Sequence, residues 1–317
     1  MPLIPEIRNR ERTLREPDLP QGDLPHVLCI VGPTASGKTA LAVKAAHKLN
    51  GEVISADSMQ IYKYMDIGTA KPAPAEQEGI PHHLIDFLEP SEEYSVVQYV
   101  AAAKALITDI AARGRTPIIA GGTGQYVSAL VDNLDFDQSE PGTELHAELE
   151  AQLAERGRGF IHARLRELDP EAAEAIHPNN VKRVLRALEM RIATGLTLAE
   201  RNARSREKPV FARYSVYGID IDRRELYERI DRRVDRMLAA GLEAEARFVA
   251  GLHPGRTASQ AIGYKEFAPY FSGEATLDAV AEAIKKNSRN YAKRQLTWFR
   301  RPEWVNWRSP EELLRLF

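Results

Sequence analysis

Residues 32–39 read Gly-Pro-Thr-Ala-Ser-Gly-Lys-Thr, and they decide the fold. They fit the pattern GxxxxGK[ST] at every fixed position, they follow an apolar run at 27–31, and helical spacing begins at Lys38. A strand, a glycine-rich turn and a helix in this order are typical of a phosphate-binding P-loop. A coincidental match at a tight turn is the alternative, and the flanking elements argue against it. The stretch therefore predicts phosphate binding by an α/β core, without saying what is done with the phosphates.

The residue types in this loop suit a phosphate. Glycines let backbone N–H groups turn inward, and the N-terminus of the following helix adds partial positive charge. Lys38 supplies a full charge, and the hydroxyl of Thr39 is a ligand for Mg²⁺. The predicted phosphate-binding residues are Gly32, Pro33, Thr34, Ala35, Ser36, Gly37, Lys38 and Thr39, with Thr39 as the metal contact.

Strands and helices alternate around this loop. Short apolar runs at 53–56, 84–86, 116–120 and 214–219 predict further strands, and segments with helical spacing separate them. Such alternation implies a parallel sheet covered by helices on both faces. The predicted fold class is therefore α/β, a P-loop-containing parallel sheet flanked by helices.

A long helical stretch interrupts the alternation from Thr143 to about Ala203, so an all-helical insertion is expected. The strand pattern then resumes, and a basic helical segment ends the chain. The predicted parts are a flexible tail at 1–25, a P-loop core at 26–134 and 207–317, and a helical insertion domain at 135–206.

The composition is that of a globular protein, with 317 residues of which 44% are hydrophobic and 28% charged. The lone cysteine, Cys29, excludes an intrachain disulfide, and its apolar neighbours predict a buried thiol. No apolar stretch approaches the roughly 20 residues that span a bilayer, and the N-terminus has no signal-peptide core. We therefore expect a cytoplasmic protein that does not contact membranes.

The net charge of −2 argues against a nucleic-acid partner, but the charge is unevenly distributed. Residues 285–301 contain seven Lys or Arg and no Asp or Glu, with Tyr291, Trp298 and Phe299 among them. Aromatic and basic side chains together can stack bases and hold phosphates. The alternative is a core aromatic row with a solvated basic face, and this segment alone does not decide between them.

Two further groups of basic residues lie on predicted helices. Arg229, Arg233 and Arg236 recur at i, i+4 and i+7, which indicates either a solvated face or a guanidinium clamp on phosphate. A second cluster on the insertion consists of Lys182, Arg183 and Arg186.

Polar residues follow two of the predicted strands. Asp57 comes after the second strand and Thr123 after the Gly-Gly turn at 121–122. In an open α/β sheet the carboxyl ends of the strands face the ligand crevice, so both side chains are expected near the phosphate loop. Asp57 could instead cap a following helix, and Thr123 could satisfy its own turn.

Eight motifs together resemble those of the tRNA dimethylallyltransferase family, over about residues 27–308. They are Gly-Pro-Thr-Ala-Ser-Gly-Lys-Thr (32–39), Ser-Ala-Asp-Ser-Met-Gln-Ile-Tyr (55–62), Met-Asp-Ile-Gly-Thr-Ala-Lys-Pro (65–72), Pro-His-His-Leu-Ile-Asp (81–86), Gly-Gly-Thr-Gly-Gln-Tyr (121–126), Val-Lys-Arg-Val-Leu-Arg-Ala-Leu-Glu (181–189), Gln-Ala-Ile-Gly-Tyr-Lys-Glu (260–266) and Ala-Lys-Arg-Gln-Leu-Thr-Trp-Phe (292–299). Many nucleotide-binding proteins share the first motif, whereas 55–72 and 292–299 are much more specific.

The resemblance implies transfer of a dimethylallyl group from dimethylallyl diphosphate to N6 of adenine 37, next to the tRNA anticodon. By this resemblance Asp57 is the general base, Thr34 and Arg233 line the reaction channel, and the P-loop holds the diphosphate, with Thr39 and Mg²⁺ at the metal site. Arg229, in the same arginine row, is also assigned to the diphosphate. The implied tRNA contacts are Asp57, Ser58, Met59, Gln60, Thr123, His146, Lys182, Arg183, Val184, Leu185, Arg186, Gln260, Ala261, Ile262, Gly263, Tyr264 and Lys265.

This chain departs from the family pattern at two places. Gly124-Gln125 stands where the family often has an apolar pair, and His146 is the nearest match to an expected arginine contact. These departures concern the contacts to the anticodon stem-loop of tRNA and not the reaction. We expect the protein to act as a monomer.

Three other functions are alternatives to tRNA prenylation. An adenylate dimethylallyltransferase would use the same donor, but it has no obvious need for the insertion and the basic C-terminal segment. A small-molecule kinase would use the P-loop for ATP, and phosphoryl transfer would distinguish it. A non-catalytic RNA-binding module would leave Asp57 and the intact P-loop without a purpose.

Overall fold

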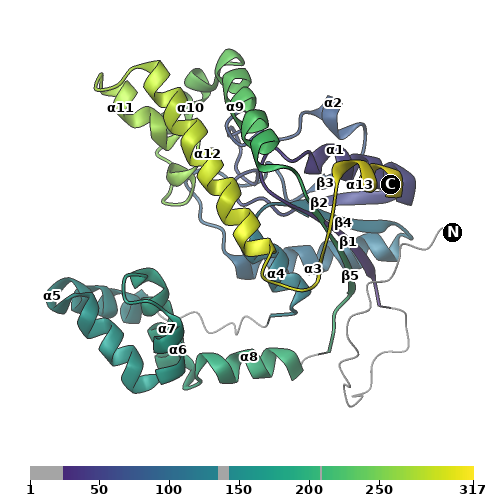
Figure 1. Ribbon diagram of the computed structural model, residues 1–317. Coiled ribbons are helices and arrows are strands. Elements are labelled where there is room, and N and C mark those ends of the chain that lie inside the picture. Colours follow the sequence, from purple (N-terminus) through teal and green to yellow (C-terminus); the bar gives the residue numbers. More distant parts are fainter. Residues whose placement is uncertain (1–23, 135–142, 208) are drawn as a thin grey trace. The chain divides into compact units, whose positions relative to one another are not determined.

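A six-stranded sheet, in which every neighbouring pair of strands is parallel, organises the described part of the chain, residues 24–134, 143–207 and 209–317 of the computed structural model (Figure 1). In sheet order the strands are β3 (His82–His83), β2 (Gly51–Ser55), β4 (Thr116–Gly121), β1 (His26–Val31), β5 (Arg213–Ile219) and β6 (Val305–Arg308). The predicted fold class is confirmed.

The chain forms two units, which we call the α/β unit and the helical unit. The α/β unit joins the residues up to Ser128 with Phe211–Phe317, and the helical unit is Ala129–Val210. The predicted insertion was 135–206. Most of the predicted tail, residues 1–23, and the stretch 135–142 lie outside the described residues.

Helices cover both faces of the sheet, as expected for parallel strands. On one face Leu28 and Ile30 pack against α1 and α13. From the other side α3 places the buried Tyr99 close to Cys29, and its ring stacks on Tyr126 of α4 with centroids 4.0 Å apart. Cys29 is buried, and burial raises the pKa of its thiol, so the predicted buried thiol is confirmed. The helices and 3₁₀ turns that include residues of the α/β unit are α1 (Lys38–Leu49), α2 (Pro74–Gln77), α3 (Val96–Ala112), α4 (Gly124–Val131), α9 (Arg223–Ala239), α10 (Leu242–Gly251), η1 (Ala258–Gln260), η2 (Lys265–Phe267), α11 (Ala268–Phe271), α12 (Leu277–Phe299) and α13 (Pro310–Leu316).

The strand register brings three strand ends to one level. Val31 of β1 lies opposite Gly121 of β4, and Ser55 of β2 lies opposite Ala120 of β4. The loops that follow these strands therefore meet at one edge of the sheet, where ligands of open α/β folds bind.

A buried carboxylate on β2 ties neighbouring segments together. The side chain of Glu52 is 2% exposed, and it accepts hydrogen bonds from Arg113, at 2.8 Å from Nη2, and from Arg115, at 2.7 Å. His83 Nε2 of β3 lies 2.7 Å from the same group. The bonds from Arg113 are the main reason why the pKa of Glu52 is lowered to about 2, so this group remains charged inside the fold.

One predicted strand was wrong, and one strand was missed. The strand expected at 84–86 is instead the pair His82–His83, because Leu84 (φ 55°) and Asp86 (φ 57°) are left-handed and cannot continue a strand. Strand β6 was not predicted. Gly241 (φ 99°) separates α9 from α10, which begins at Leu242.

The helical unit contains four helices among its described residues: α5 (Thr143–Leu168), α6 (Pro170–Ala175), α7 (Val181–Thr194) and α8 (Leu198–Glu207). Leu149, Leu165 and Leu188 are central to its core. The chain breaks between α5 and α6 at Asp169-Pro170, where Asp169 Oδ1 caps α6 by accepting the N–H of Ala172 at 3.1 Å. In the described ranges of both units, no helix has the length and apolar character needed to cross a membrane.

Candidate active site

A cavity of about 230 Å³ opens at the carboxyl edge of the sheet, inside the α/β unit. Its wall is formed by the phosphate loop, the segment after β2, the chain around Gly68 and Gln260, and the helices α9 and α12, which run side by side (Figure 1). The polar side chains that line it include Thr34, Asp57, Arg233, Tyr291 and Arg294. The apolar side chains include Met59, Ile230, Val234, Met237, Ile262 and Ile284.

The phosphate loop has the backbone geometry expected for a P-loop. Gly37 (φ 93°) is the N-cap of α1, and Ala35 (φ 64°) also adopts a left-handed conformation, which is strained for a residue with a Cβ. Within the described residues Ser36 Oγ is buried and has no hydrogen-bond partner. A buried hydroxyl without a partner at the start of a helix is suited to a phosphate oxygen.

Lys38 bridges this loop, because its Nζ donates to the carbonyl of Pro33 at 2.6 Å. Burial lowers the pKa of Lys38 to about 8, and Arg233 adds to this effect, while Asp57 opposes it. The ammonium group is therefore still mostly charged at neutral pH, and an anion bound beside it would favour the charged form further.

Thr34 is held from two helices that come much later in the chain. Arg233 of α9 donates from Nη1 to Thr34 Oγ1 at 3.1 Å. Gln295 of α12 accepts the N–H of Thr34 at 2.8 Å and donates to the carbonyl of Gly122 at 2.9 Å. Gly122 has no room for a side chain, because a Cβ would lie 2.1 Å from Gln295 Nε2. Gln295 thus joins the phosphate loop to the end of β4.

The sequence patterns did not single out Gln295, although it lies within the motif at 292–299. The side chain is 5% exposed and stands four residues from Tyr291 and from the buried Phe299. This spacing places it on the buried face of α12, and a buried amide needs hydrogen-bond partners. That spacing could have identified it, but the sequence analysis of this segment considered only its basic and aromatic residues.

The arginine row of α9 does not act as one unit. Arg233 lines the cavity and contacts Thr34, and burial lowers its pKa. Arg229 pairs with Glu225 of the same helix at 2.6 Å and is not among the described residues that line the cavity. The structure therefore brings Arg233 to the phosphate loop, whereas Arg229, assigned to the diphosphate from the sequence, is held by an acidic neighbour.

Asp57 and Thr123 lie together at the ends of β2 and β4. Asp57 lines the cavity, and its Oδ1 accepts the N–H groups of Met59 at 2.9 Å and Gln60 at 3.4 Å. Asp57 therefore caps a turn, not the following helix that the alternative interpretation expected, and it also lines the cavity. Thr123 Oγ1 accepts the N–H of Ser58 at 3.0 Å, so it joins the two strand ends instead of satisfying its own turn.

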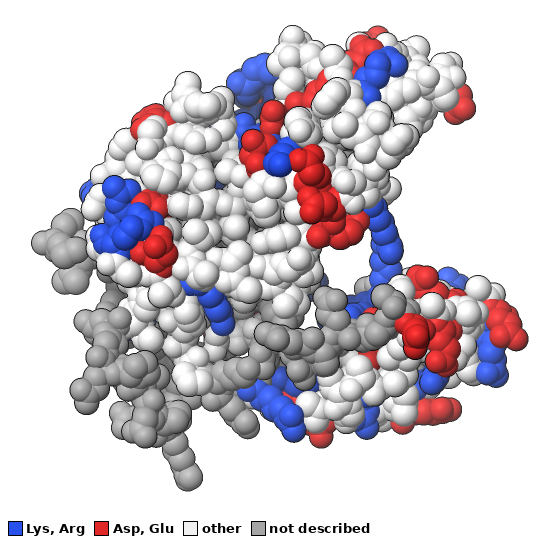
Figure 2. All heavy atoms as spheres, turned by 180° about the vertical axis from the view of Figure 1, so that it is seen from behind, with Lys and Arg blue, Asp and Glu red and all other residues white. Residues whose placement is uncertain are grey.

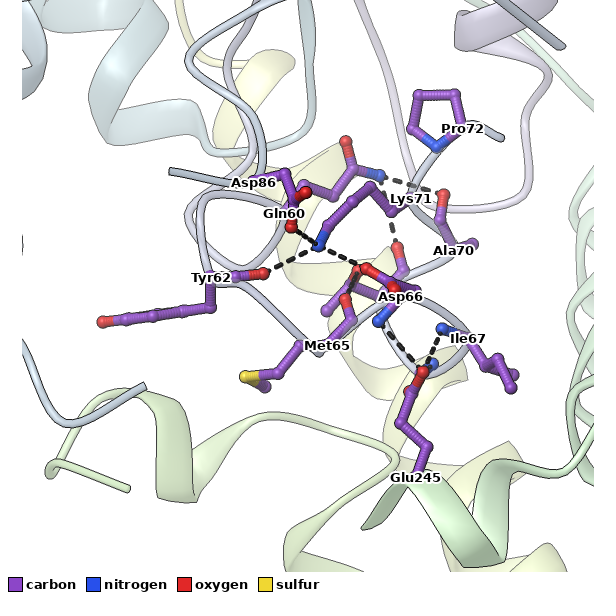
Figure 3. Close-up of polar contacts among 12 residues, drawn as sticks. Gln60, Tyr62, Met65, Asp66, Ile67, Ala70, Lys71, Pro72, Asp86 and Glu245 are labelled. Carbon is purple, nitrogen blue, oxygen red and sulfur yellow. Dashed lines mark hydrogen bonds and ion pairs between the residues drawn. The ribbon is translucent and has the colours of Figure 1, made fainter. Parts of the chain in front are cut away.

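The segment 260–265, assigned to tRNA from the sequence, divides into two groups. Gln260, Ala261, Ile262 and Lys265 line the cavity, whereas Gly263 and Tyr264 are buried behind its wall. Gln60, assigned to tRNA as well, donates from Nε2 to the carbonyls of Thr69 at 3.2 Å and Ala70 at 3.1 Å (Figure 3).

The helical unit presents its basic cluster on one face of α7. Lys182, Arg183 and Arg186 are exposed, whereas Val184 (1% exposed) and Leu185 (5%) belong to the core of the unit. The tRNA contacts predicted for Val184 and Leu185 stay a prediction, and the amphipathic α7 buries the side chains of both residues. They support the face that carries the three cations. His146 lies beside Glu189 of α7 and 3.4 Å from Glu150.

Acidic partners neutralise part of the basic run at 285–301. Lys285 pairs with Asp235 at 2.8 Å, Arg289 pairs with Asp231, and Arg300 lies 3.5 Å from Asp220. The remaining members, Lys286, Lys293, Arg294 and Arg301, are at least partly exposed. The run is therefore a mixed surface rather than a uniform basic stripe. Acidic and basic side chains also lie near one another on the face that Figure 2 presents, which is the back of the view in Figure 1.

Comparisons with known proteins find similar proteins over most of the chain. A model of the IPP transferase family matches residues 60–302. The tRNA dimethylallyltransferase of Acetivibrio thermocellus is 48% identical over 289 residues, which cover 90% of this chain and 92% of that protein. The one of Geobacillus kaustophilus is 50% identical over 283 residues, 89% of each protein.

Solved structures of the same kind superimpose on the chain. The full-length tRNA isopentenylpyrophosphate transferase of Bacillus halodurans gives a TM-score of 0.68 at 42% identity, covering 92% of this chain and 94% of that one. A eukaryotic dimethylallyltransferase acting on tRNA gives a TM-score of 0.76 at 33% identity, covering 87% of this chain and 70% of that one. With the family model matching most of its length and relatives this close, the chain belongs to the IPP transferase family.

Proposed function

We propose that this protein transfers the dimethylallyl group of dimethylallyl diphosphate to N6 of adenine 37, beside the anticodon of tRNA. One observation carries the proposal. A single cavity contains a carboxylate, Asp57, and the Thr34–Arg233 pair of a phosphate loop, with apolar side chains between α9 and α12. These are the groups needed to accept a proton, hold a diphosphate and enclose a hydrocarbon.

Asp57 acts as the general base in this proposal. The adenine N6 amine is a poor nucleophile, because its lone pair is delocalised into the ring. As N6 attacks C1 of the dimethylallyl group, the C1–O bond breaks, diphosphate leaves with the bonding pair, and the N6 proton passes to the carboxylate. A base placed in this way contributes about 10²–10⁴-fold to the rate.

The phosphate loop holds the leaving diphosphate rather than the tail of ATP. Lys38 supplies a positive charge, Ser36 Oγ a hydroxyl without another partner among the described residues, and Arg233 a guanidinium fixed on Thr34. Charge that accumulates on the leaving oxygens is stabilised most strongly by such fixed donors in a site that excludes water.

Mg²⁺ is expected at Thr39, in the first turn of α1. The described residues contain no cluster of three or more His, Cys, Asp or Glu side chains that could hold a metal on their own. A single hydroxyl, that of Thr39, fits Mg²⁺, because this ion commonly keeps water ligands and takes the rest from substrate phosphates. When bound, the ion would neutralise diphosphate charge, and Thr39 would supply one hydroxyl ligand.

The apolar wall binds the dimethylallyl group. Ile230 and Val234 of α9 face the cavity together with Ile284 of α12. An apolar wall beside the reacting carbon excludes water, which would otherwise compete with N6 for the allylic carbon.

The names of the relatives favour tRNA over a free nucleotide as the acceptor, and the same comparisons give no support to a kinase. The exposed cations of α7 and the cavity-lining side chains of Gln260 and Lys265 are the proposed tRNA contacts.

The deciding experiment incubates the protein with labelled dimethylallyl diphosphate and unmodified tRNA, and then analyses the nucleosides. We expect label in N6-(dimethylallyl)adenosine, dependent on Mg²⁺. Parallel reactions replace tRNA with AMP, or the donor with labelled ATP. Efficient labelling of AMP without labelling of tRNA, or phosphoryl transfer from ATP, would contradict the proposal.

A further inference from the structure

Glu245 of α10 accepts four hydrogen bonds on one carboxylate. Three come from consecutive backbone N–H groups, those of Asp66 (3.1 Å), Ile67 (2.8 Å) and Gly68 (2.9 Å). The fourth comes from the hydroxyl of Tyr264 at 2.7 Å. Figure 3 shows the Glu245 carboxylate beneath the backbone at Asp66 and Ile67. A carboxylate in this position anchors the loop of residues 65–71 to α10.

The same carboxylate connects two walls of the cavity. Gly68 and Thr69 line the cavity from the loop, and Gln260, Ala261, Ile262 and Lys265 line it from the segment that contains Tyr264. The ring of Tyr264 packs directly against Gly68, where a Cβ would lie 2.5 Å from a ring carbon. Glu245 itself is not among the described residues that line the cavity.

Two further side chains fix the other parts of this loop. Lys71 Nζ donates to the carbonyl of Tyr62 at 2.8 Å and to Asp86 at 2.7 Å, and it also contacts Asp66 (Figure 3). Gln60 donates to the carbonyls of Thr69 and Ala70. The loop is thus held on both sides of Gly68 and Thr69, which fits a fixed wall better than a mobile lid.

We propose that Glu245, acting with Tyr264, is a positioning residue that sets the acceptor side of the cavity, where the target base of the RNA enters. This inference rests on the proposed function for the identity of the acceptor. The phosphate loop is held separately, by Arg233 and Gln295. Loss of Glu245 therefore alters recognition of the acceptor and leaves the diphosphate end unchanged.

The test compares Glu245→Gln, Tyr264→Phe and the control Glu243→Gln. Glutamine has nearly the same shape, but its NH₂ group would face backbone N–H donors. Tyr264→Phe keeps the ring against Gly68 and removes one hydrogen bond. Glu243 is on the same helix and pairs with Arg247, so its change controls for the loss of one negative charge from α10.

Hydrogen exchange of the free protein tests the contact without any assumption about the reaction. In Glu245→Gln we expect the amides of residues 66–68 to exchange about tenfold faster or more, because bonds to a charged acceptor are lost. The control should exchange like wild type. Unchanged exchange at 66–68, or exchange that rises equally throughout the α/β unit, would overturn the inference.

Kinetics then separates positioning from general damage. We expect Glu245→Gln to raise the KM for tRNA about tenfold, Tyr264→Phe to raise it less, and inhibition by pyrophosphate to stay within about twofold of wild type. An unchanged KM for tRNA, or equal losses for tRNA and pyrophosphate, would overturn the inference. If wild type transfers no prenyl group, the proposed function fails, and tRNA affinity together with the exchange data still tests the contact.

Discussion

In the α/β unit Thr34 is held by side chains that lie 199 and 261 residues further along the chain, whereas the cations of the helical unit come from consecutive turns of one helix. The first arrangement requires the complete tertiary fold. The second requires only that α7 buries Val184 and Leu185 and leaves Lys182, Arg183 and Arg186 outside.

This difference corresponds to two tasks. A reacting group must stay within a fraction of an ångström of its partner, so its neighbours are buried and fixed. A cation that attracts phosphates acts over several ångströms, so an exposed and mobile side chain is sufficient. Changes in the α/β unit should therefore alter catalysis steeply, and changes on α7 should alter affinity gradually.

The largest effect is expected at Asp57. Asp57→Asn keeps an oxygen that can cap the turn but removes the base, so turnover should fall by about 10²–10⁴-fold. Single-turnover assays with saturating tRNA measure this loss, and tRNA affinity should remain close to that of wild type. Asp57→Ala should lose similar activity and also some stability, because the cap on Met59 is gone. A loss below tenfold would show that Asp57 is not the base.

The next effect concerns the diphosphate. Lys38→Ala and Arg233→Ala should each reduce turnover by about 10²-fold, because each removes a fixed donor to the leaving group. Inhibition by added pyrophosphate should weaken in both. Arg229→Ala is the matched control, since Arg229 lies on the same helix and pairs with Glu225. If Arg229→Ala weakens pyrophosphate inhibition as much as Arg233→Ala, the division of the arginine row is wrong.

The buried carboxylate Glu52 gives the third test, on stability. Its pKa is lowered from 4.5 to about 2 by Arg113 and its other partners, so its stabilising effect is present above pH 4.5 and is lost as the pH falls to about 2. Glu52→Gln should therefore lower the free energy of unfolding by about 3 kcal/mol at pH 7.

Tryptophan fluorescence during urea unfolding measures this effect, because Trp298, Trp304 and Trp307 all lie in the α/β unit. The difference between wild type and Glu52→Gln should shrink as the pH is lowered toward 2. Glu225→Gln, which breaks an exposed pair, should change the free energy of unfolding by about 0.5 kcal/mol or less. A difference that is constant with pH would contradict the role given to the Glu52 charge.

The smallest effect is expected on α7. Alanine at Lys182, Arg183 and Arg186 should weaken tRNA binding and flatten its salt dependence by about one unit per lost phosphate contact. Titrations at several salt concentrations measure this slope, and pyrophosphate inhibition should not change. The matched control removes three exposed arginines of α5, namely Arg156, Arg158 and Arg166. Equal slopes for the α7 variant and wild type would mean that this face does not hold the RNA.

The two regions also differ in how far the sequence predicts them. The P-loop, Asp57 after β2 and the exposed face of α7 follow from local patterns, since each depends on neighbouring residues or on one helical period. Local patterns do not determine the order of the strands in the sheet. Strand β6 was missed because four residues of mixed polarity, Val305–Arg308, form a strand only beside β5.

The partners of the site were the hardest to predict. Gln295 and Glu245 are ordinary polar helix residues until the fold brings Thr34 to one and the backbone of residues 66–68 to the other. The error at 84–86 has the same origin. Two left-handed residues, Leu84 and Asp86, turn this run into a bend. Aspartate adopts that conformation more often than most residues, but leucine gives no signal of it.

The contact between Gln295 and Thr34 has a consequence for how the protein is made. The phosphate loop emerges early from the ribosome, but the amide that holds its backbone follows 261 residues later. During synthesis the contact between Thr34 and Gln295 cannot form until α12 has left the exit tunnel. Nascent chains that end before α12 therefore carry every residue of the phosphate loop but lack the amide that accepts the N–H of Thr34.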